Sequence, residues 1–224
     1  MRIAILGTGR VGRTLGLRWV QAGEGVLFGS RSPQQARFDE PWAQSVPALP
    51  YTEAIAQADV VLLAVPYQAA LQIAEAHRDM LAGRVVIDCT NPLNANFTGL
   101  EVGFTTSAAE QIAARAPRAR LVKAFNTVST ATMADPVYEG RSAALFYCGD
   151  DLPAKQCVAQ LAERLGFAPV DAGPLANARL LEPLAMLAIY LSCHGWGSQC
   201  AWQLVTRAGA TDSSNCSHSG KEHP

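Results

Sequence analysis

Apolar and polar residues along the chain follow two periods: short runs that are apolar throughout, and longer stretches in which apolar residues recur every three or four positions. Apolar runs are typical of strands buried on both faces of a parallel sheet, and the longer period indicates amphipathic helices. The strands expected in the first half are Arg2–Leu6, Gly25–Phe28, Val60–Ala64, Arg84–Asp88 and Arg120–Ala124. The helices expected between them are Val11–Ala22, Tyr51–Gln57, Gln68–Met80 and Ala108–Ala114. This order predicts an α/β fold, a Rossmann-like, doubly wound, mainly parallel sheet with helices on both faces.

The strand and helix pattern continues beyond Gly140. A strand Ala143–Cys148, a helix Pro153–Leu165 and a strand Phe167–Val170 are expected to extend the same sheet. An almost continuously apolar helix follows around Leu180–Leu191. Because so apolar a helix must be covered, we expect it to pack on the sheet, to roof a ligand pocket or to form a dimer interface.

Two glycines then interrupt the helical pattern. Gly195 and Gly197 are expected to end the apolar helix, and Ser198–Arg207 is expected to form a final short helix. Residues 211–224 are polar and show no periodicity, so they are expected to be a disordered tail.

The most informative motif is a glycine-rich turn between the first strand and the first helix. Gly7-Thr8-Gly9-Arg10-Val11-Gly12 matches the dinucleotide fingerprint in its required position. In such a turn the first glycine permits the tight bend, the second admits a pyrophosphate, and the third lets helix and strand pack closely. The helix N-terminus adds free N–H groups for the anion.

The end of the second strand indicates which dinucleotide is bound. NAD-binding proteins usually place a carboxylate there for the ribose hydroxyls, but this chain has Ser30 and Arg31. A hydroxyl and a guanidinium suit a 2′-phosphate, which favours NADP(H). The expected organisation is therefore an NADP-binding Rossmann domain (1–140), a sheet extension with C-terminal helices (141–210) and the tail (211–224).

Composition restricts the partners. The chain has 224 residues, 49% of them apolar, and a formal net charge of -1, so it has no electrostatic footprint for nucleic acid or an anionic membrane. The apolar stretch from Leu180 to Cys193 contains Glu182 and Pro183 and is too short to span a bilayer. With no export signal recognisable at the start, we expect a cytoplasmic protein whose partner is a small molecule.

Cysteines and histidines do not indicate a metal site. None of the six cysteines forms a Cys-x-x-Cys pair or stands at a zinc-ligand interval from a histidine. We therefore expect buried, reduced thiols and no metal. His194, beside the glycines that end the apolar helix, is interpreted as a capping or core residue.

Three further motifs each follow a predicted strand. They are Ala64-Val65-Pro66-Tyr67, Asp88-Cys89-Thr90-Asn91-Pro92-Leu93 and Lys123-Ala124-Phe125-Asn126-Thr127. Because ligands of doubly wound sheets bind outside the carboxyl ends of the strands, these motifs are expected at the binding edge. From the residues alone, Asn91 and Asn126 could equally be loop caps, Lys123 could point to solvent, and Tyr67 and Phe125 are interpreted as core residues.

Taken together, these motifs with the later GPLANARLLEPLAMLAI resemble the NADP-dependent oxidoreductase family typified by the NADPH-dependent coenzyme F420 (deazaflavin) reductases, and the cytosolic reductase domain of STEAP-type membrane ferric reductases is similar. The resemblance runs from Met1 to about Arg207. The combination of DCTNPL and KAFNT is more specific than the glycine motif.

The resemblance implies roles for individual residues. Thr8, Arg10 and Val11 would line the pyrophosphate and adenosine side, and Ser30 and Arg31 the 2′-phosphate. Where the cofactor crosses the sheet edge, the implied contacts are Ala64, Val65 and Pro66. The residues implied to frame the nicotinamide and the acceptor stacked on it are Asn91, Pro92, Ala124 and Asn126. Family members often carry a lysine shortly after the Ser-Arg pair; here Arg37 could substitute for it.

The function implied is hydride transfer between NADP(H) and a flavin or deazaflavin, with F420, FMN or FAD as the acceptor. The apolar C-terminal helix makes a homodimer the expected state. Such a transfer needs stacking geometry and exclusion of water more than acid–base side chains. Short-chain dehydrogenases are excluded because no tyrosine has a lysine four residues later. Two alternatives stay open, an imine reductase like the pyrroline-carboxylate enzymes and an NADP(H) sensor without turnover. A filled space near Asn91 and Asn126 would favour the sensor.

Overall fold

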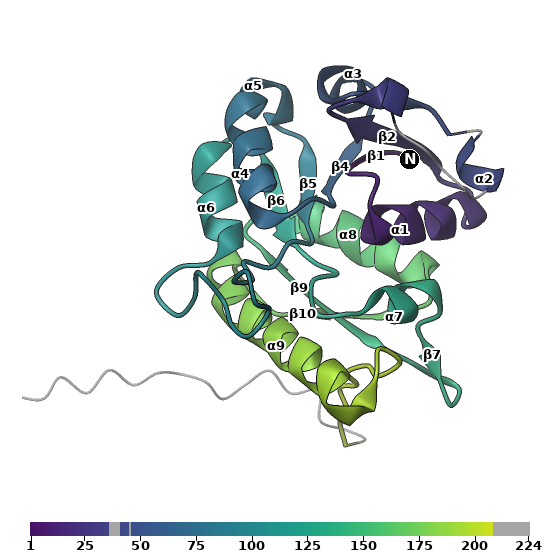
Figure 1. Cartoon of the computed structure of the whole chain (residues 1–224), viewed down its shortest axis with the longest axis vertical. Coiled ribbons are helices and arrows are strands. Elements are labelled where there is room, and N and C mark those ends of the chain that lie inside the picture. Colours follow the sequence, from purple (N-terminus) through teal and green to yellow (C-terminus); the bar gives the residue numbers. More distant parts are fainter. Residues whose placement is uncertain (36–40, 45, 208–224) are drawn as a thin grey trace, which may run out of the picture.

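A central eight-stranded sheet organises the computed structural model, which describes residues 1–35, 41–44 and 46–207 (Figure 1). Its strands lie in the order β10-β9-β6-β5-β4-β1-β2-β3, and all neighbours are parallel except the antiparallel pair β6 and β9. Their bounds are β1 Arg2–Leu6, β2 Gly25–Ser30, β3 Ala48–Pro50, β4 Val60–Leu63, β5 Val85–Asp88, β6 Arg120–Lys123, β9 Ala144–Gly149 and β10 Ala168–Asp171. The predicted Rossmann-like, mainly parallel sheet and its extension beyond Gly140 are confirmed.

Helices cover both faces of this sheet. The bounds are α1 Arg10–Gln21, α2 Pro41–Gln44, α3 Tyr51–Ala56, α4 Tyr67–Ala76, α5 Arg78–Leu81, α6 Ala108–Arg115, α7 Thr130–Ala134, α8 Leu152–Arg164 and α9 Ala178–Leu191. α1, α7 and α8 contribute to the core on one face; α3, α4, α6 and the start of α9 contribute to the core on the other. Figure 1 shows α4 and α6 side by side, as are α1 and α7.

The alternation of side chains along the central strands explains why both faces are covered. Ile3 and Ile5 of β1 belong to the core under α1, whereas Ala4 and Leu6 belong to the core under α3. All four are fully buried. A strand that is apolar at every position needs helices on both sides, and the crossover connections supply them.

Two helix predictions are wrong in part. The helix expected over Gln68–Met80 is two helices, α4 and α5, because His77 leaves the helical region with φ −117° and ψ 18°. The segment Ser198–Arg207 forms no helix. Instead it runs beside the sheet, where the Trp202 carbonyl accepts a hydrogen bond from the Ala144 N–H at 2.8 Å. The Trp202 carbonyl therefore bonds to β9 and not to an N–H group of its own segment, as it would in a helix.

Several short elements gave no sequence signal strong enough to predict. They are β3, α7, the hairpin of β7 (Val137–Tyr138) and β8 (Arg141–Ser142), and the helical turns Pro33–Gln35, Leu175–Asn177 and Ser192–Trp196. The last turn contains His194, whose Nδ1 lies 2.8 Å from the Tyr190 carbonyl and whose ring stacks on Tyr190.

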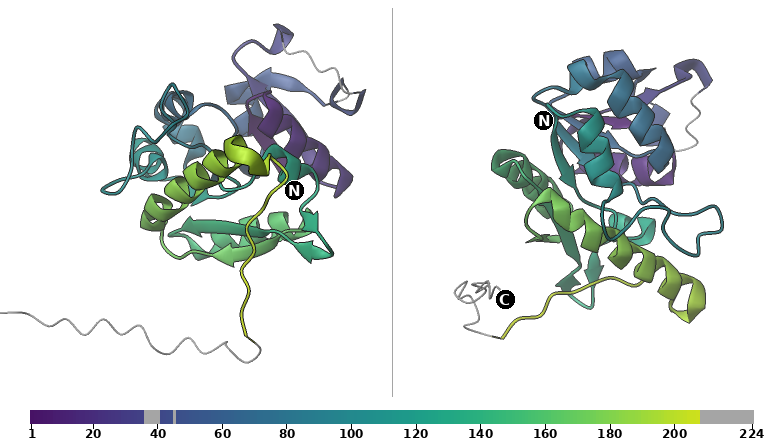
Figure 2. Two further views of the ribbon diagram at one scale, coloured as in Figure 1. Left: turned by 60° about the horizontal axis from the view of Figure 1, so that its bottom comes forward. Right: turned by 90° about the vertical axis from the view of Figure 1, so that its left-hand side faces the viewer.

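The apolar helix α9 is only partly covered. Its start is buried, but Leu180, Leu187 and Tyr190 are 66%, 47% and 53% exposed. Figure 2 shows α9 at the outside of the molecule, with the chain beyond it leading away as an extended segment. The expectation of buried thiols holds fully for Cys148 alone among the described cysteines, all of which are free thiols. Cys89, Cys157 and Cys200 are partly buried, and Cys193, just after α9, is exposed. Cys216 and the expected tail lie outside the described residues.

Candidate functional site: a dinucleotide cleft at the sheet edge

The glycine-rich turn is shaped by contacts that exclude a side chain at two of its glycines. Gly7 has a φ of 121°, and a Cβ built on it would lie 2.2 Å from the Ala64 carbonyl oxygen. A Cβ on Gly12 would lie 2.4 Å from the Gly7 carbonyl oxygen. Around Gly9 the same construction meets no atom within 4 Å, so its surface is open. An open glycine at the start of α1 is where a pyrophosphate could approach the backbone.

This turn forms the floor of a cleft of about 400 Å³ at the carboxyl ends of β1, β2 and β4. Its lining residues are Gly7, Thr8, Gly9, Gly29, Ser30, Arg31, Ser32, Tyr51, Ala64, Val65 and Pro66. The structure thus brings together eight of the predicted cofactor residues. Three others take different places: Val11 packs against the core, Gly12 holds α1 to the turn, and Arg10 faces a separate groove.

The adenosine end of the cleft is polar and cationic. No carboxylate is among the described residues that line it. Ser30 Oγ accepts a hydrogen bond from the Ser32 N–H at 3.1 Å, which fixes the loop after β2. Tyr51 also lines the cleft; burial raises the pKa of its phenol, and the nearby Arg31 charge partly opposes that shift. A fixed hydroxyl and an arginine suit a 2′-phosphate. Arg37, the possible substitute for the family lysine, lies outside the described residues.

Beyond the cleft, two asparagines join the ends of β5 and β6. Asn91 Nδ2 donates to the Asn126 carbonyl at 3.0 Å, and Asn126 Nδ2 donates to Asn91 Oδ1 at 3.1 Å and to the Leu181 carbonyl of α9 at 3.1 Å. Since both partners of Asn126 Nδ2 are acceptors, the orientation of this amide is fixed. Both amides therefore bond to carbonyl groups of neighbouring segments, as the loop-capping interpretation predicts.

Three polar atoms at this edge are buried without a hydrogen-bond partner: Thr90 Oγ1, Asn126 Oδ1 and Thr127 Oγ1. Buried polar groups are nearly always paired, so unpaired ones at a candidate site indicate a ligand that completes them. A group that offers both N–H donors and a carbonyl acceptor, such as the carboxamide of nicotinamide, would satisfy an amide oxygen and two hydroxyls. The residues present therefore fit the predicted cofactor at both ends.

Phe125 holds this edge in place through a strained backbone. Its φ is 63°, a region that costs a non-glycine residue about 1 kcal/mol or more. The ring is fully buried and makes edge-on contacts with Trp19 and Phe167, at centroid distances of 5.8 and 6.0 Å. Packing of the ring thus stabilises the turn that carries Asn126, and the interpretation of Phe125 as a core residue is confirmed.

The prediction that Lys123 could point to solvent is wrong. Its side chain is fully buried, with Nζ 2.9 Å from Asp88 Oδ2, 2.8 Å from Glu182 Oε1 and 2.6 Å from the Thr90 carbonyl. Glu182 in turn accepts hydrogen bonds from the Ala108 and Ala109 N–H groups at the start of α6. We call these three side chains, Asp88, Lys123 and Glu182, the buried triad.

The buried triad links α9 to the strand ends that carry the asparagines. Burial lowers the pKa of Lys123, but the attraction of Asp88 and Glu182 outweighs that effect and raises it overall, so Lys123 stays charged. Sequence reasoning missed Glu182 entirely. A charged residue inside an otherwise apolar helix was the one available signal, because such a residue needs a buried partner.

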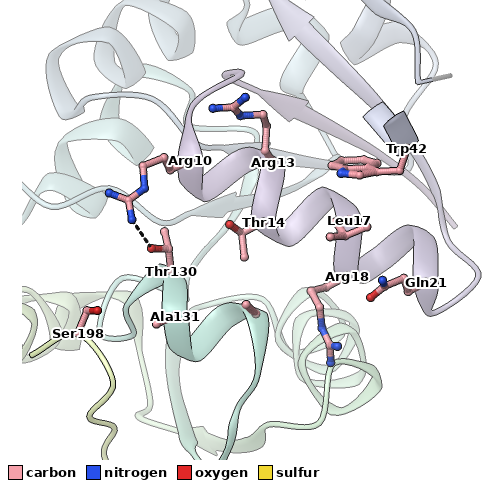
Figure 3. Close-up of a pocket in the computed structure, with 11 residues that line it drawn as sticks. Arg10, Arg13, Thr14, Leu17, Arg18, Gln21, Trp42, Thr130, Ala131 and Ser198 are labelled. Atoms are coloured by element: carbon pink, nitrogen blue, oxygen red, sulfur yellow. Dashed lines mark hydrogen bonds between the residues drawn. The ribbon is translucent and has the colours of Figure 1, made fainter. Parts of the chain in front are cut away.

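Two more cavities lie around the stretch of chain that follows Asn126. One is apolar, about 270 Å³ in volume, and is lined by Thr127, Ser129, Ala188, Leu191, Ser192, Trp196, Cys200, Ala201 and Trp202. The other is a groove of about 610 Å³ along α1 (Figure 3). The apolar cavity begins at the residue that follows Asn126. Ala188 and Leu191 of α9 form part of its wall.

The fold and this site define a dinucleotide-binding oxidoreductase of the Rossmann class. A family model described as "NADP oxidoreductase coenzyme F420-dependent" matches residues 2–92. The F420-dependent NADP reductase of Methanothermobacter thermautotrophicus is 34% identical over 212 residues, with 86% of this chain and 89% of that protein covered. The chain belongs to this family and is an NADP-dependent oxidoreductase, as the motifs predicted.

Other similarities agree with this membership. The metalloreductase STEAP3 of Rattus norvegicus is 33% identical over 195 residues; 83% of this chain is covered but only 37% of STEAP3. A crystal structure from Arthrobacter sp. FB24, assigned as an F420-dependent NADP reductase, superposes with a TM-score of 0.84 at 30% identity and covers 92% of this chain and all of that one. A Bacillus cereus imine reductase, 18% identical with a TM-score of 0.62, shares the fold alone.

No helix in the described ranges is long and apolar enough to cross a lipid bilayer. Nor do three or more His, Cys, Asp or Glu side chains in those ranges gather where they could hold a metal ion.

Proposed function

We propose that this protein transfers hydride between NADP(H) and a planar flavin or deazaflavin ring stacked on the nicotinamide. The observation that carries the proposal is the apolar cavity that begins at Thr127 and has Trp196 and Trp202 in its walls. It adjoins the asparagine pair, where the unpaired Asn126 Oδ1 suits the N–H group of a carboxamide. An apolar, partly enclosed space beside the nicotinamide suits a flat, largely apolar ring.

In this proposal residues 1–140 bind the dinucleotide. Ser30 and Arg31 hold the 2′-phosphate, Gly9 admits the pyrophosphate, and Ala64–Pro66 support the chain of the cofactor across the sheet edge. When bound, NADP(H) supplies the hydride donor or acceptor itself. Three buried atoms bond to the carboxamide and thereby fix which face of the nicotinamide ring points to the acceptor. They are Asn126 Oδ1, Thr90 Oγ1 and Thr127 Oγ1.

The residues after 140 complete the acceptor side. α9 is held to the asparagine pair through the Leu181 carbonyl and through the buried triad. Its later turns and the segment 196–202 enclose the apolar cavity and would exclude water from the reacting atoms. No acid or base is needed for hydride transfer to a ring, in keeping with the absence of a histidine from the described lining of this cavity.

Coenzyme F420 is the first candidate acceptor because relatives of similar length are named F420-dependent NADP reductases. FMN and FAD offer related rings and are the other candidates. The metal reduction that the name STEAP3 describes is not part of the proposal, because this chain covers only 37% of that protein.

The proposal includes a homodimer in the cytoplasm. Leu180, Leu187 and Tyr190 leave an exposed apolar face on α9, which a second copy could cover. The free thiols among the described cysteines suit a reducing compartment.

Anaerobic NADPH oxidation by the purified protein tests the proposal. The acceptors would be F420, FMN, FAD and riboflavin, with NADH as the parallel donor. We expect turnover with at least one ring acceptor and a preference for NADPH. Tight NADPH binding without turnover on any acceptor would favour the sensor, and turnover on a cyclic imine the imine reductase.

A further inference from the structure

A groove of about 610 Å³ follows the outer face of α1 and does not belong to the dinucleotide cleft. Its lining residues are Arg10, Arg13, Thr14, Leu17, Arg18, Gln21, Trp42, Thr130, Ala131, Ala134 and Ser198. Three of them are arginines, and no carboxylate is among these described lining residues. Because guanidinium groups stay protonated at any physiological pH, each of these three described side chains carries a permanent positive charge.

The three arginines all belong to α1. Figure 3 shows Arg10 reaching across the groove to α7, where its Nη2 lies 3.5 Å from Thr130 Oγ1. Arg13 stands one turn further along α1. Arg18 is anchored by a 2.8 Å hydrogen bond from Nη2 to the Leu165 carbonyl. The groove therefore combines a fixed arginine at its far end with two arginines near the sheet edge.

The groove and the apolar cavity share a wall. One short stretch of chain, residues 127–131, lines both. Thr127 and Ser129 face the apolar cavity, and Thr130 and Ala131 face the groove. Ser129 Oγ donates a 2.6 Å hydrogen bond to the carbonyl of Ser198, which lines the groove on its other side. An apolar cavity for a flat ring thus lies beside a cationic groove.

We propose that this arginine groove binds the anionic side chain of the acceptor, so that the enzyme selects ring acceptors that carry phosphate or carboxylate groups. This inference rests on the proposed function, because the ring must occupy the apolar cavity for its side chain to reach the groove. Arg13 is the main specificity residue because it stands on α1 between Arg10, at the glycine turn, and Arg18, at the far end of the groove.

Two acceptors that share the same ring system and differ only in the anionic group measure the effect of the groove. FMN and riboflavin form one pair; F420 and the same deazaflavin without its phosphate-bearing side chain form the other. We expect the wild-type protein to have a KM at least about tenfold lower for the phosphorylated member, the effect of one charge-assisted hydrogen bond. This preference should shrink at high ionic strength, because the groove is open to solvent.

Arg13→Gln is the decisive variant. It should raise the KM for the phosphorylated acceptor about tenfold and leave the KM for the uncharged ring and the Kd for NADPH unchanged; Arg13→Lys should restore part of the preference. Arg118→Gln is the matched control, because Arg118 is an exposed arginine far from the groove that pairs with Asp79. It should alter none of these values.

Binding without turnover separates this inference from the proposed function. Quenching of FMN fluorescence is measured with NADP+ present, for the wild type and for Arg13→Gln. Arginine-dependent FMN binding without NADPH oxidation supports the groove and contradicts the proposed function. Equal KM values for FMN and riboflavin, or an Arg13→Gln effect of the same size on both, overturn the groove while the reductase stands. Failure of all four acceptors to bind overturns both.

Discussion

Replacing Lys123 by methionine should destabilise this protein more than either single neutralisation of its partners. The substitution keeps the length and the apolar part of the side chain but removes the ammonium group. Asp88 and Glu182 would then remain as two buried carboxylates without a cation between them, each with no exposed side-chain surface. Only the N–H groups of Thr90, Ala108 and Ala109 would still stabilise their charge.

The structure sets the expected size of this effect. At contact distances of 2.9 and 2.8 Å, an effective dielectric constant of about 20 gives a gross attraction of about 6 kcal/mol for each pair. Taking three charged groups out of water offsets much of this gain, and removing one partner of a buried pair typically costs about 3–5 kcal/mol. For a chain of this length, that loss lowers Tm by on the order of 10 °C.

Asp88→Asn and Glu182→Gln provide the comparison. Each leaves one lysine paired with one carboxylate, a neutral arrangement, and in Glu182→Gln the amide oxygen would remain as an acceptor for the start of α6. Either should cost clearly less than Lys123→Met. Urea unfolding at pH 7, followed by circular dichroism and tryptophan fluorescence, gives the three free energies. A loss below about 1 kcal/mol for Lys123→Met, or a larger loss for Asp88→Asn, would refute the reasoning.

Four further predictions use other parts of the site. Arg31→Ala should weaken NADPH binding by about 1.5–3 kcal/mol, measured by titration, and an equal loss for NADH would contradict the 2′-phosphate contact. Gly9→Val should abolish binding of both nucleotides, because its side chain would fill the open surface where the pyrophosphate approaches; retained affinity would mean that the turn is only structural. Thr127→Val removes a buried hydroxyl that has no partner in the protein, so it should leave Tm unchanged yet raise the KM for NADPH several-fold; an unchanged KM would mean that the hydroxyl does not meet the cofactor. Burial raises the pKa of Cys89 and Cys148 to about 12, so both thiols should stay protonated and slow toward a disulfide reagent at pH 8, while the exposed Cys193 reacts fast; rapid modification of Cys148 would contradict the structure.

The pKa of Lys123 also gives the chain a pH dependence of known sign. Because the folded-state pKa is raised above the unfolded value of about 10.4, the contribution of Lys123 to stability is complete below pH 10 and is lost as the pH rises through the folded-state pKa. The difference in unfolding free energy between wild type and Lys123→Met should therefore shrink in strongly alkaline solution. A difference that grew there would show that the lysine is not held in its charged form.

Much of the fold was predictable because its signals are local. The central strands are apolar at every position, and the glycines of the turn stand at fixed intervals, so their residues indicate the sheet and its binding edge. The predictions were weakest where local preference competes with a distant partner. Ser198–Arg207 is the clearest case, since it pairs with β9 through Trp202 instead of forming a helix.

The amino-acid sequence by itself determined the Rossmann class, the glycine turn at the sheet edge and the preference for NADP(H), because a glycine turn and a strand tip act through their own backbone and side chains. Only the tertiary structure decided that Lys123 is buried between Asp88 and Glu182, that the Asn126 amide has one unpaired oxygen, and that an apolar cavity and an arginine groove lie side by side. These features join residues far apart in the chain, and the free energy of a buried charge or an unpaired oxygen depends on its surroundings, which no local pattern contains.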